Sequence, residues 1–200
     1  MERQHLRVFV ACGTGRSFSR LLRAVRPLMA DEKCELFVQR GPGTDDFAAL
    51  PGLALIDRAA FAERLAWADV VVCHGGAGTL YEAFCAGHVP IVVPRLKRFG
   101  EHVNDHQLEL AEALSLRKLA FVVHPGEDLL ESIRPAAAHR GPPRDALRNA
   151  QELSVAVHAA MGSTGLAGQR PPATRKLART LASLARRVIE RGAHASKPGS

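Results

Sequence analysis

The chain has 200 residues, 46% of them hydrophobic, which suits one α/β domain with an extension. No run approaches the roughly 20 apolar residues that a membrane-spanning helix needs. The net charge of +7 comes from the C-terminal tail, because residues 1–168 hold 19 basic and 19 acidic residues whereas residues 169–200 hold 8 and one. The basic pI therefore gives little support to nucleic-acid binding by the domain.

Short apolar runs alternate with helical patterns along the first 160 residues. We expect strands at residues 7–12, 34–39, 53–56, 69–73, 90–93 and 120–123. We expect helices at residues 18–29, 61–67, 105–116, 128–133 and 145–160, and one that runs from a glycine loop at 74–79 through Ala86. This alternation predicts a single α/β domain, Rossmann-like, with a doubly wound parallel sheet. The apolar strand around Val71 fits a sheet that is covered on both faces.

The domain is expected to span residues 1–161. Residues 162–172 are rich in Gly and Pro and predict a linker, and residues 174–191 could form a basic helix within the tail that follows. The polar segment at residues 1–7 does not resemble a signal peptide, so we expect a cytoplasmic protein. Four cysteines, whose spacing matches neither a zinc site nor a redox pair, are expected to be free thiols: Cys12, Cys34, Cys73 and Cys85.

Two glycine-rich loops follow predicted strands. The first is Gly13-Thr14-Gly15, and the second is the run from His74 to Thr79, with Gly75, Gly76 and Gly78. Glycines let the backbone approach a ligand, and the helix that follows offers unpaired N–H groups and a partial positive charge, which together suit a pyrophosphate. Neither loop is a Walker A motif or a full dinucleotide fingerprint. A tight strand-to-helix turn is the alternative for each.

Glu82 lies one turn into the helix after the second loop. An ionised carboxylate there could accept hydrogen bonds from both hydroxyls of a ribose. The run from Thr79 to Glu82 also has the pattern of a capping box, in which Glu82 would bond back to the backbone. The local pattern alone favours the cap.

The stretch at residues 94–107 combines three bases, two acids, two histidines and two amides in a loop and a helix start. Polar loops after buried strands are where ligand contacts concentrate. Asn104 and Gln107 would equally suit the cap of a helix. We expect no metal site here, because acids and bases surround His102 and His106.

Two segments together carry a family resemblance, the one at residues 69–94 and the one at residues 100–111. They resemble the C-terminal domain of glycosyltransferase family 28, over about residues 7–160. Within the family they are most similar to the stand-alone PssE/EpsF-type subunit of exopolysaccharide synthesis, which is related to the catalytic subunit of the eukaryotic dolichol-linked UDP-GlcNAc transferase. The combination of the glycine loop, Glu82 and Asp105-His106-Gln107 at this spacing is specific.

The resemblance implies the donor half of a GT-B fold and a role for each matching residue. Glu82 would hold the ribose of UDP, and His106 and Gln107 would touch the transferred sugar. Bases such as Arg95, Lys97 or Arg98 would stabilise the leaving UDP. The donor-binding residues that it implies are Thr14, His74, Gly75, Gly76, Ala77, Gly78, Glu82, Arg95, Asp105, His106 and Gln107.

Enzymes of this family have two Rossmann-like domains, so the resemblance implies that the chain is one half of a heteromeric, inverting transferase. No catalytic base can be assigned, and we expect it from a PssD-type membrane-anchored partner that brings the complex to the cytoplasmic membrane. The acceptor would be a lipid-linked sugar. The basic tail could bind an anionic membrane surface or could only be a solubilising extension. No cofactor is implied.

Two other classes of function share features with this sequence. A UDP-sugar epimerase shares the donor-type fold but needs both domains in one chain. A non-catalytic nucleotide-sugar sensor or scaffold would carry the same donor residues, so it stays open. The transferred sugar stays open as well, among UDP-glucose, UDP-glucuronate and UDP-GlcNAc.

Overall fold

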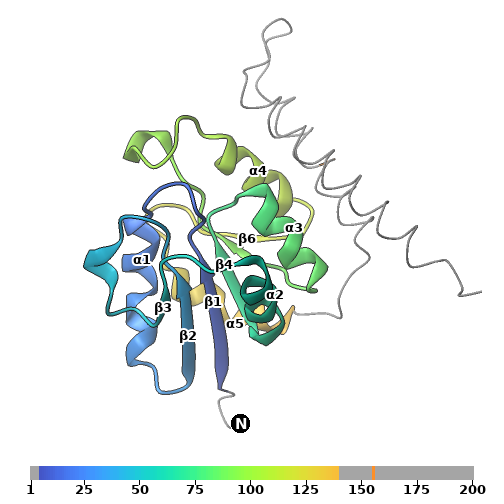
Figure 1. Cartoon of the computed structure of the whole chain (residues 1–200). Helices are drawn as coiled ribbons and strands as arrows, with labels where there is room; N and C mark the ends of the chain where they lie inside the picture. The colour runs from blue at the N-terminus through green and yellow to red at the C-terminus, as the bar shows by residue number, and fades with distance from the viewer. Residues whose placement is uncertain (1–4, 140–154, 156–200) are drawn as a thin grey trace, which may run out of the picture.

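The computed structural model describes residues 5–139 and 155, and in this part of the chain six parallel strands form one sheet. The strands are β1 (Leu6–Ala11), β2 (Cys34–Gln39), β3 (Gly52–Leu53), β4 (Val70–Cys73), β5 (Ile91–Val92) and β6 (Phe121–Val122). Their order is β3-β2-β1-β4-β5-β6. The order reverses between β1 and β4, which pair in parallel with Ala11 opposite Cys73. This confirms the predicted doubly wound α/β fold and puts the switch point of the sheet between β1 and β4 (Figure 1).

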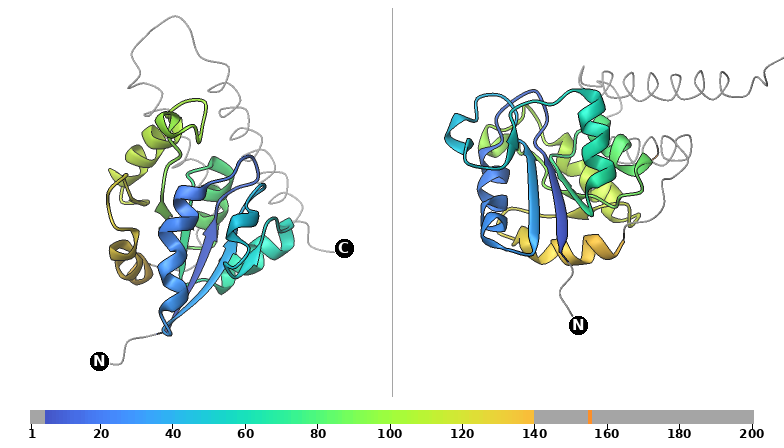
Figure 2. Two further views of the ribbon diagram at one scale, coloured as in Figure 1. Left: turned by 90° about the vertical axis from the view of Figure 1, so that its left-hand side faces the viewer. Right: turned by 60° about the horizontal axis from the view of Figure 1, so that its bottom comes forward.

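Helices cover both faces of the sheet (Figure 2). On one face, Phe9 and Val71 pack against α2 (Arg58–Trp67), α3 (Ala77–Cys85) and α4 (His106–Ser115). On the other face, Val8 and Val72 pack against α1 (Ser19–Val25) and α5 (Leu129–Ala138). The alternation of these strand residues between two cores explains why β1 and β4 are apolar throughout.

Several element bounds differ from the prediction. The first helix ends at Val25 and continues as a 3₁₀ turn, Arg26–Ala30, because Pro27 offers no N–H to an α-helical ladder. The third strand is Gly52–Leu53 rather than residues 53–56, since its partner β2 ends at Gln39, opposite Leu53. The fifth helix extends to Ala138 with Pro135 inside it. The predicted helix at residues 145–160, apart from Val155, and the linker and tail lie outside the described residues.

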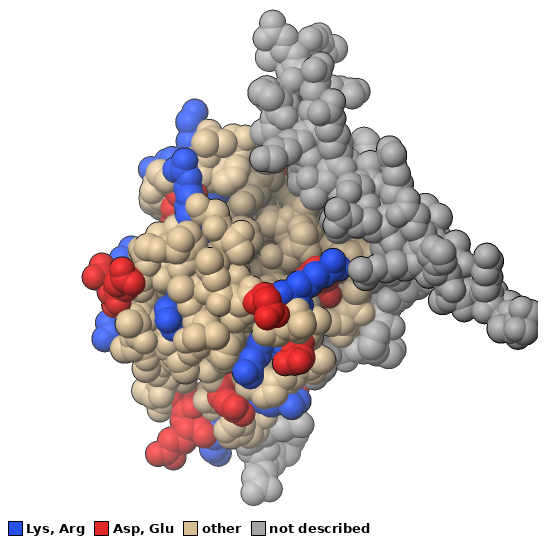
Figure 3. All heavy atoms as spheres, in the orientation of Figure 1, with Lys and Arg blue, Asp and Glu red and all other residues tan. Residues whose placement is uncertain are grey.

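Charged side chains of both signs are interspersed on the described part of the face that Figure 3 shows. Within residues 5–139, no helix is long and apolar enough to cross a membrane. The four cysteines are free thiols, as expected. Burial raises the pKa of the Cys12 and Cys73 thiols to about 12, so both act as small core side chains.

Candidate functional site

The two glycine loops lie side by side at the carboxyl edge of the sheet, because they follow the adjacent strands β1 and β4 (Figure 1). Gly13 has φ +83° and Gly75 has φ +80°, a region of backbone conformation that favours glycine. In a doubly wound sheet, ligands bind at this edge beside the switch point. Both glycine loops therefore lie at the edge where a doubly wound sheet binds its ligands.

The side chain of His74 is wedged between the loops. Its Nδ1 lies 3.3 Å from the carbonyl oxygen of Ala11, which makes Nδ1 the protonated nitrogen of a neutral ring. A Cβ atom at Gly13 would lie 2.7 Å from Cε1 of His74, and one at Gly76 would lie 2.5 Å from Nε2. A side chain at either position would therefore have to displace the ring. Burial, followed by the nearby charge of Arg95, lowers the pKa of His74 to about 4.

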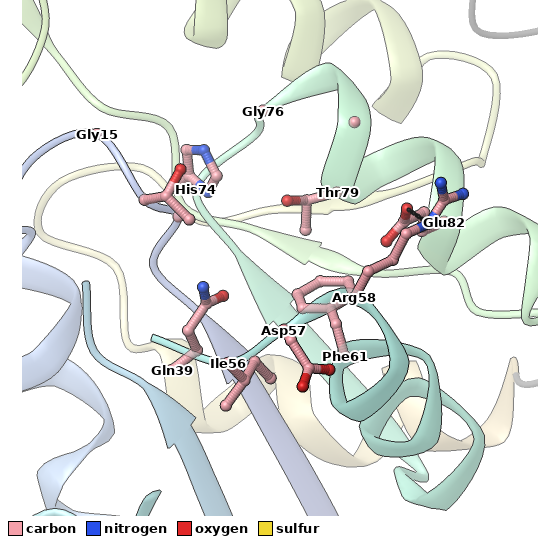
Figure 4. A pocket seen from close by; sticks show the side chains of 13 residues that line it. Gly15, Gln39, Ile56, Asp57, Arg58, Phe61, His74, Gly76, Thr79 and Glu82 are labelled. Atoms are coloured by element: carbon pink, nitrogen blue, oxygen red, sulfur yellow. Dashed lines mark ion pairs between the residues drawn. The ribbon is translucent and has the colours of Figure 1, made fainter. Parts of the chain in front are cut away.

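A cavity of about 450 Å³ opens between the first loop, the start of α2 and the start of α3 (Figure 4). It is lined by Gly13, Thr14, Gly15, Gln39, Ile56, Asp57, Arg58, Phe61, His74, Gly76, Gly78, Thr79 and Glu82. Of the predicted donor residues it brings together Thr14, His74, Gly76, Gly78 and Glu82. We call it the first cavity.

The chemistry of the first cavity changes from one end to the other. Near Gly76, α3 begins without a side-chain cap, so its first backbone N–H groups are available to an anion. Ile56 and Phe61 give an apolar wall at the start of α2. Glu82 lies beyond Thr79, with its Oε1 3.7 Å from Nε of Arg58. The cavity thus combines an anion site, an apolar wall and a carboxylate.

The capping box, the alternative interpretation of Glu82, is wrong. The cap of α3 is Gly76, so Thr79 is already inside the helix, and no side chain caps this helix. The Glu82 side chain pairs with Arg58 and lines the cavity, 31% exposed. Burial raises the pKa of Glu82, and the charge of Arg58 opposes that rise. The carboxylate is therefore open to a ligand.

A second cavity, of about 280 Å³, shares Gly15 and His74 with the first. Its other lining residues are Arg16, Arg95, His102, Val103 and Gln107. Its lining includes two arginines and no carboxylate, in contrast to the first cavity. It brings together the predicted residues His74, Arg95 and Gln107.

Four of the predicted donor residues line neither cavity. Gly75 and Ala77 belong to the second loop but are buried. Asp105 uses Oδ1 to accept a hydrogen bond of 2.8 Å from the backbone of Lys97. His106 contacts Glu109 through Nδ1 at 3.1 Å, and its Nε2 is buried without a partner among the described residues. Nor does Gln107 cap α4, since its Oε1 accepts a 3.1 Å hydrogen bond from the backbone of Arg95.

Sequence reasoning missed the part of the first cavity that comes from β2, from α2 and from the two residues before α2, namely Gln39, Ile56, Asp57, Arg58 and Phe61. The helix was expected near residue 61, but α2 begins at Arg58. The side chain of Asp57 caps it, accepting a hydrogen bond of 2.9 Å from the backbone of Ala60. An aspartate directly before a helical run is a start signal, and it could have placed these residues at the site.

Similar proteins share both the sequence pattern and the fold. Residues 7–160 match the glycosyltransferase family 28 C-terminal domain. A UDP-N-acetylglucosamine–N-acetylmuramyl-(pentapeptide) pyrophosphoryl-undecaprenol N-acetylglucosamine transferase of Geobacter metallireducens is 32% identical over 149 residues, covering 67% of this chain and 39% of that protein. The transferase of the same name from Geobacter sulfurreducens is 30% identical over 145 residues, covering 65% and 38%. The chain thus spans about two fifths of the length of these relatives.

The fold also recurs in solved structures. CalG4, the calicheamicin glycosyltransferase, superposes with a TM-score of 0.50 at 21% identity, over 92% of this chain and 44% of that one. The glycotransferase of kitacinnamycin gives a TM-score of 0.51 at 17% identity, over 90% and 43%. These likenesses show the fold, and the match over residues 7–160 shows the family: the chain belongs to glycosyltransferase family 28, through the C-terminal domain of that family.

Proposed function

We propose that the chain binds a UDP-sugar and forms the donor-binding subunit of an inverting hexosyltransferase. The observation that carries this proposal is the first cavity, where an uncapped helix start and a carboxylate lie on either side of Thr79. The diphosphate would lie at the start of α3 and the first glycine loop, where backbone N–H groups and the helix dipole favour negative charge. Glu82 would accept hydrogen bonds from the ribose hydroxyls.

The apolar wall of the first cavity would take the uracil ring. Ile56 and Phe61 lie at the start of α2, across the cavity from the glycine loops (Figure 4). Gln39, the last residue of β2, lines the same region with an amide that can pair with a base edge. An apolar wall with few polar groups is the usual construction of a small-molecule site.

The second cavity would receive the sugar, since it is adjacent to the first and shares His74 and Gly15 with it. Gln107 is the predicted sugar-contacting residue that lines it. We keep four predicted residues as supports of the second cavity, namely Gly75, Ala77, Asp105 and His106. Their direct contact with the donor stays a prediction.

We further propose that the acceptor is a lipid-linked sugar, in exopolysaccharide synthesis, and that the acceptor face and the base come from a PssD-type membrane-anchored subunit. In support, the Geobacter relatives are named for transfer to a pyrophosphoryl-undecaprenol acceptor, and the chain spans only about two fifths of their length. Of the carboxylates of the first cavity, Asp57 caps α2 and Glu82 is assigned to the ribose, so neither is assigned as the base. Recruitment by such a partner would bring the chain to the membrane that holds its acceptor.

Titration calorimetry with UDP and 2′,3′-dideoxy-UDP tests the donor site. Glu82→Ala should weaken UDP binding about tenfold to a hundredfold, because hydrogen bonds to a charged group contribute about 1.5–3 kcal/mol. The same substitution should change the affinity for the dideoxy nucleotide little, since the ribose hydroxyls are absent. Glu112→Ala, which removes an exposed carboxylate from α4, is the matched control. Equal losses for both nucleotides would show that Glu82 does not hold the ribose.

Transfer is tested separately, by co-expressing the chain with a PssD-type subunit and supplying UDP-glucose, UDP-glucuronate or UDP-GlcNAc with a lipid-pyrophosphate acceptor. We expect transfer from one of these donors only when both chains are present. Robust transfer by the chain alone would contradict the two-subunit proposal. Donor binding without transfer in the presence of the partner would favour the alternative, a non-catalytic nucleotide-sugar-binding module.

A further inference from the structure

Arg95 reaches from the loop after β5 to the first glycine loop. Its side chain is buried, with the residue 4% exposed. Its Nη2 donates to the carbonyl oxygen of Cys12 at 2.7 Å and to that of Arg16 at 2.6 Å. These two carbonyls stand at the beginning and the end of the first glycine loop. One side chain therefore fixes both ends of that loop.

The backbone of Arg95 contacts Gln107, another residue that lines the second cavity. Its N–H donates to Oε1 of Gln107 at 3.1 Å, and an N–H needs an acceptor, so the amide oxygen must face it. The NH₂ group of Gln107 is then the part of the amide that remains for a ligand. Arg95 thus sets the orientation of Gln107 as well as the course of the first glycine loop.

The segment that carries Arg95 is itself anchored to α1. Arg20 pairs with both carboxylate oxygens of Glu101 at 2.9 Å and donates to the carbonyl of Pro94 at 2.7 Å. Glu101 also accepts a hydrogen bond from the backbone of Leu96 at 3.0 Å. Bidentate arginine–carboxylate pairs add geometric specificity to their strength. The neighbours of Arg95 on both sides are therefore held in place.

The guanidinium of Arg95 is packed rather than free. Its central carbon lies 5.0 Å from the centre of the Phe18 ring, and its Nε is buried without a partner among the described residues. A guanidinium used in this way has little freedom to follow a leaving phosphate. The contacts suit a group that organises the site around it.

We propose that Arg95 is a positioning residue, which holds the first glycine loop and the Gln107 amide in the geometry that the second cavity needs. It acts on the donor through these two groups rather than by touching it. Binding sites depend on such supporting contacts, because small displacements of the groups that touch the ligand weaken binding strongly. The identity of the ligand rests on the proposed function. The role of Arg95 in holding the first glycine loop and Gln107 does not.

The experiment compares Arg95→Met, Arg95→Lys and Arg7→Met in the full chain. Arg7 is the control, because it makes a two-bond pair with Asp69 at the amino end of β1, remote from both cavities. The first measurement is backbone amide hydrogen exchange without ligand, over residues 13–16 and 102–107 and over β1 and β4. The second is the affinity for UDP and for UDP-glucose, by calorimetry.

For Arg95→Met we expect amide exchange to rise about tenfold or more over residues 13–16 and 102–107, with exchange in β1 and β4 unchanged. Local opening of these two segments would no longer require the hydrogen bonds of Arg95 to break. The affinity for UDP-glucose should fall about tenfold, the equivalent of one charged hydrogen bond. Lysine can offer one nitrogen to the two carbonyls, so Arg95→Lys should restore part of both losses. Arg7→Met should leave the loops and the affinity as in the wild type.

A fall in affinity with unchanged loop exchange would show that Arg95 touches the donor, and would overturn the proposal. Faster exchange throughout the sheet would equally overturn it, because Arg95 would then be a general core residue. If Arg95→Met does not fold, the exchange of Arg95→Lys decides the matter in the same way. Failure of the wild type to bind either nucleotide would refute the proposed function alone, since the exchange measurement needs no ligand.

Discussion

The two cavities share His74 and Gly15 but are built from different parts of the chain. The first is lined largely by residues at the ends of regular elements, β2, α2 and α3. The second is lined mostly by two loops, one after β1 and one after β5, and those loops are held by arginines. The first contains two carboxylates, Asp57 and Glu82, whereas the lining of the second contains none.

The difference matches the two parts of the proposed ligand. A nucleotide is the same for every UDP-sugar, and strand and helix ends can hold it in one fixed geometry. A sugar varies between donors, and loops vary more readily than the elements that they connect. On this view the loop residues of the second cavity, rather than Glu82 or α3, determine which sugar is accepted.

The largest effect is expected at Gly76, which lines the first cavity and lies against His74, a residue that both cavities share. Gly76→Ala would place a methyl group 2.5 Å from Nε2 of His74, so we expect a loss of about 1–3 kcal/mol in the free energy of unfolding from overpacking. Displacement of the ring should also weaken UDP binding about tenfold or more, as with other misplaced binding groups. Urea denaturation and calorimetry measure the two effects.

Gly78 provides the matched control, two residues further along. Nothing lies within 4 Å of a Cβ built there, and Gly78 is inside α3. Gly78→Ala should therefore raise the free energy of unfolding by up to about 1 kcal/mol, through helix propensity. If both substitutions destabilise equally, contact with His74 is not what requires glycine at residue 76.

Much of the fold and half of the site could be predicted from local patterns. Apolar strands such as β4 and loops such as the one after it carry their signal in consecutive residues. Glu82 was found through its spacing from the second glycine loop. Its capping alternative failed because α3 starts at Ala77, three residues earlier than the capping box requires.

The remainder depends on contacts between segments far apart in the sequence. The pattern of charges around Arg95 suggested a ligand contact, yet its guanidinium bonds to carbonyls of Cys12 and Arg16, some 80 residues away. The residues next to Arg95 in the sequence give no signal of these contacts. Ile56 and Arg58 were missed for a smaller reason, a helix start placed three residues late.

An intermediate effect should separate the second cavity from the first. Glu101 lines neither cavity, but its carboxylate, 11% exposed, receives three hydrogen bonds that anchor the loop. Glu101→Gln should cost about 1–2 kcal/mol of folding stability, because donors of Arg20 lose their charged partner. The loss of these charged hydrogen bonds should also lower the affinity for UDP-glucose severalfold more than it lowers the affinity for UDP.

The control is Glu112→Gln, the same change at an exposed carboxylate of α4 that lines neither cavity. It should leave the ratio of the two affinities unchanged. Equal weakening of UDP and UDP-glucose by Glu101→Gln would show that this loop supports both cavities alike, and the contrast between them would be lost.

The smallest effect concerns His74, the wall that both cavities share. Its pKa of about 4 lies below the 6.5 of an ordinary imidazole, mainly because of burial and then because of Arg95, with His102 adding to the shift and the Ala11 carbonyl opposing it. Between these two values the unfolded chain binds more protons than the folded one, so stability is full above pH 6.5 and falls as the pH approaches 4. From pH 7 to pH 5 we expect this group to lower the free energy of unfolding by about 1 kcal/mol, less than the full shift implies because the ring borders two open cavities.

His74→Gln removes the titration, so urea denaturation at both pH values should show a smaller fall in the free energy of unfolding for the variant. An equal fall in the free energy of unfolding for both proteins would mean that the His74 ring is protonated in the folded protein. His74, between the two cavities, would then carry a charge at acid pH.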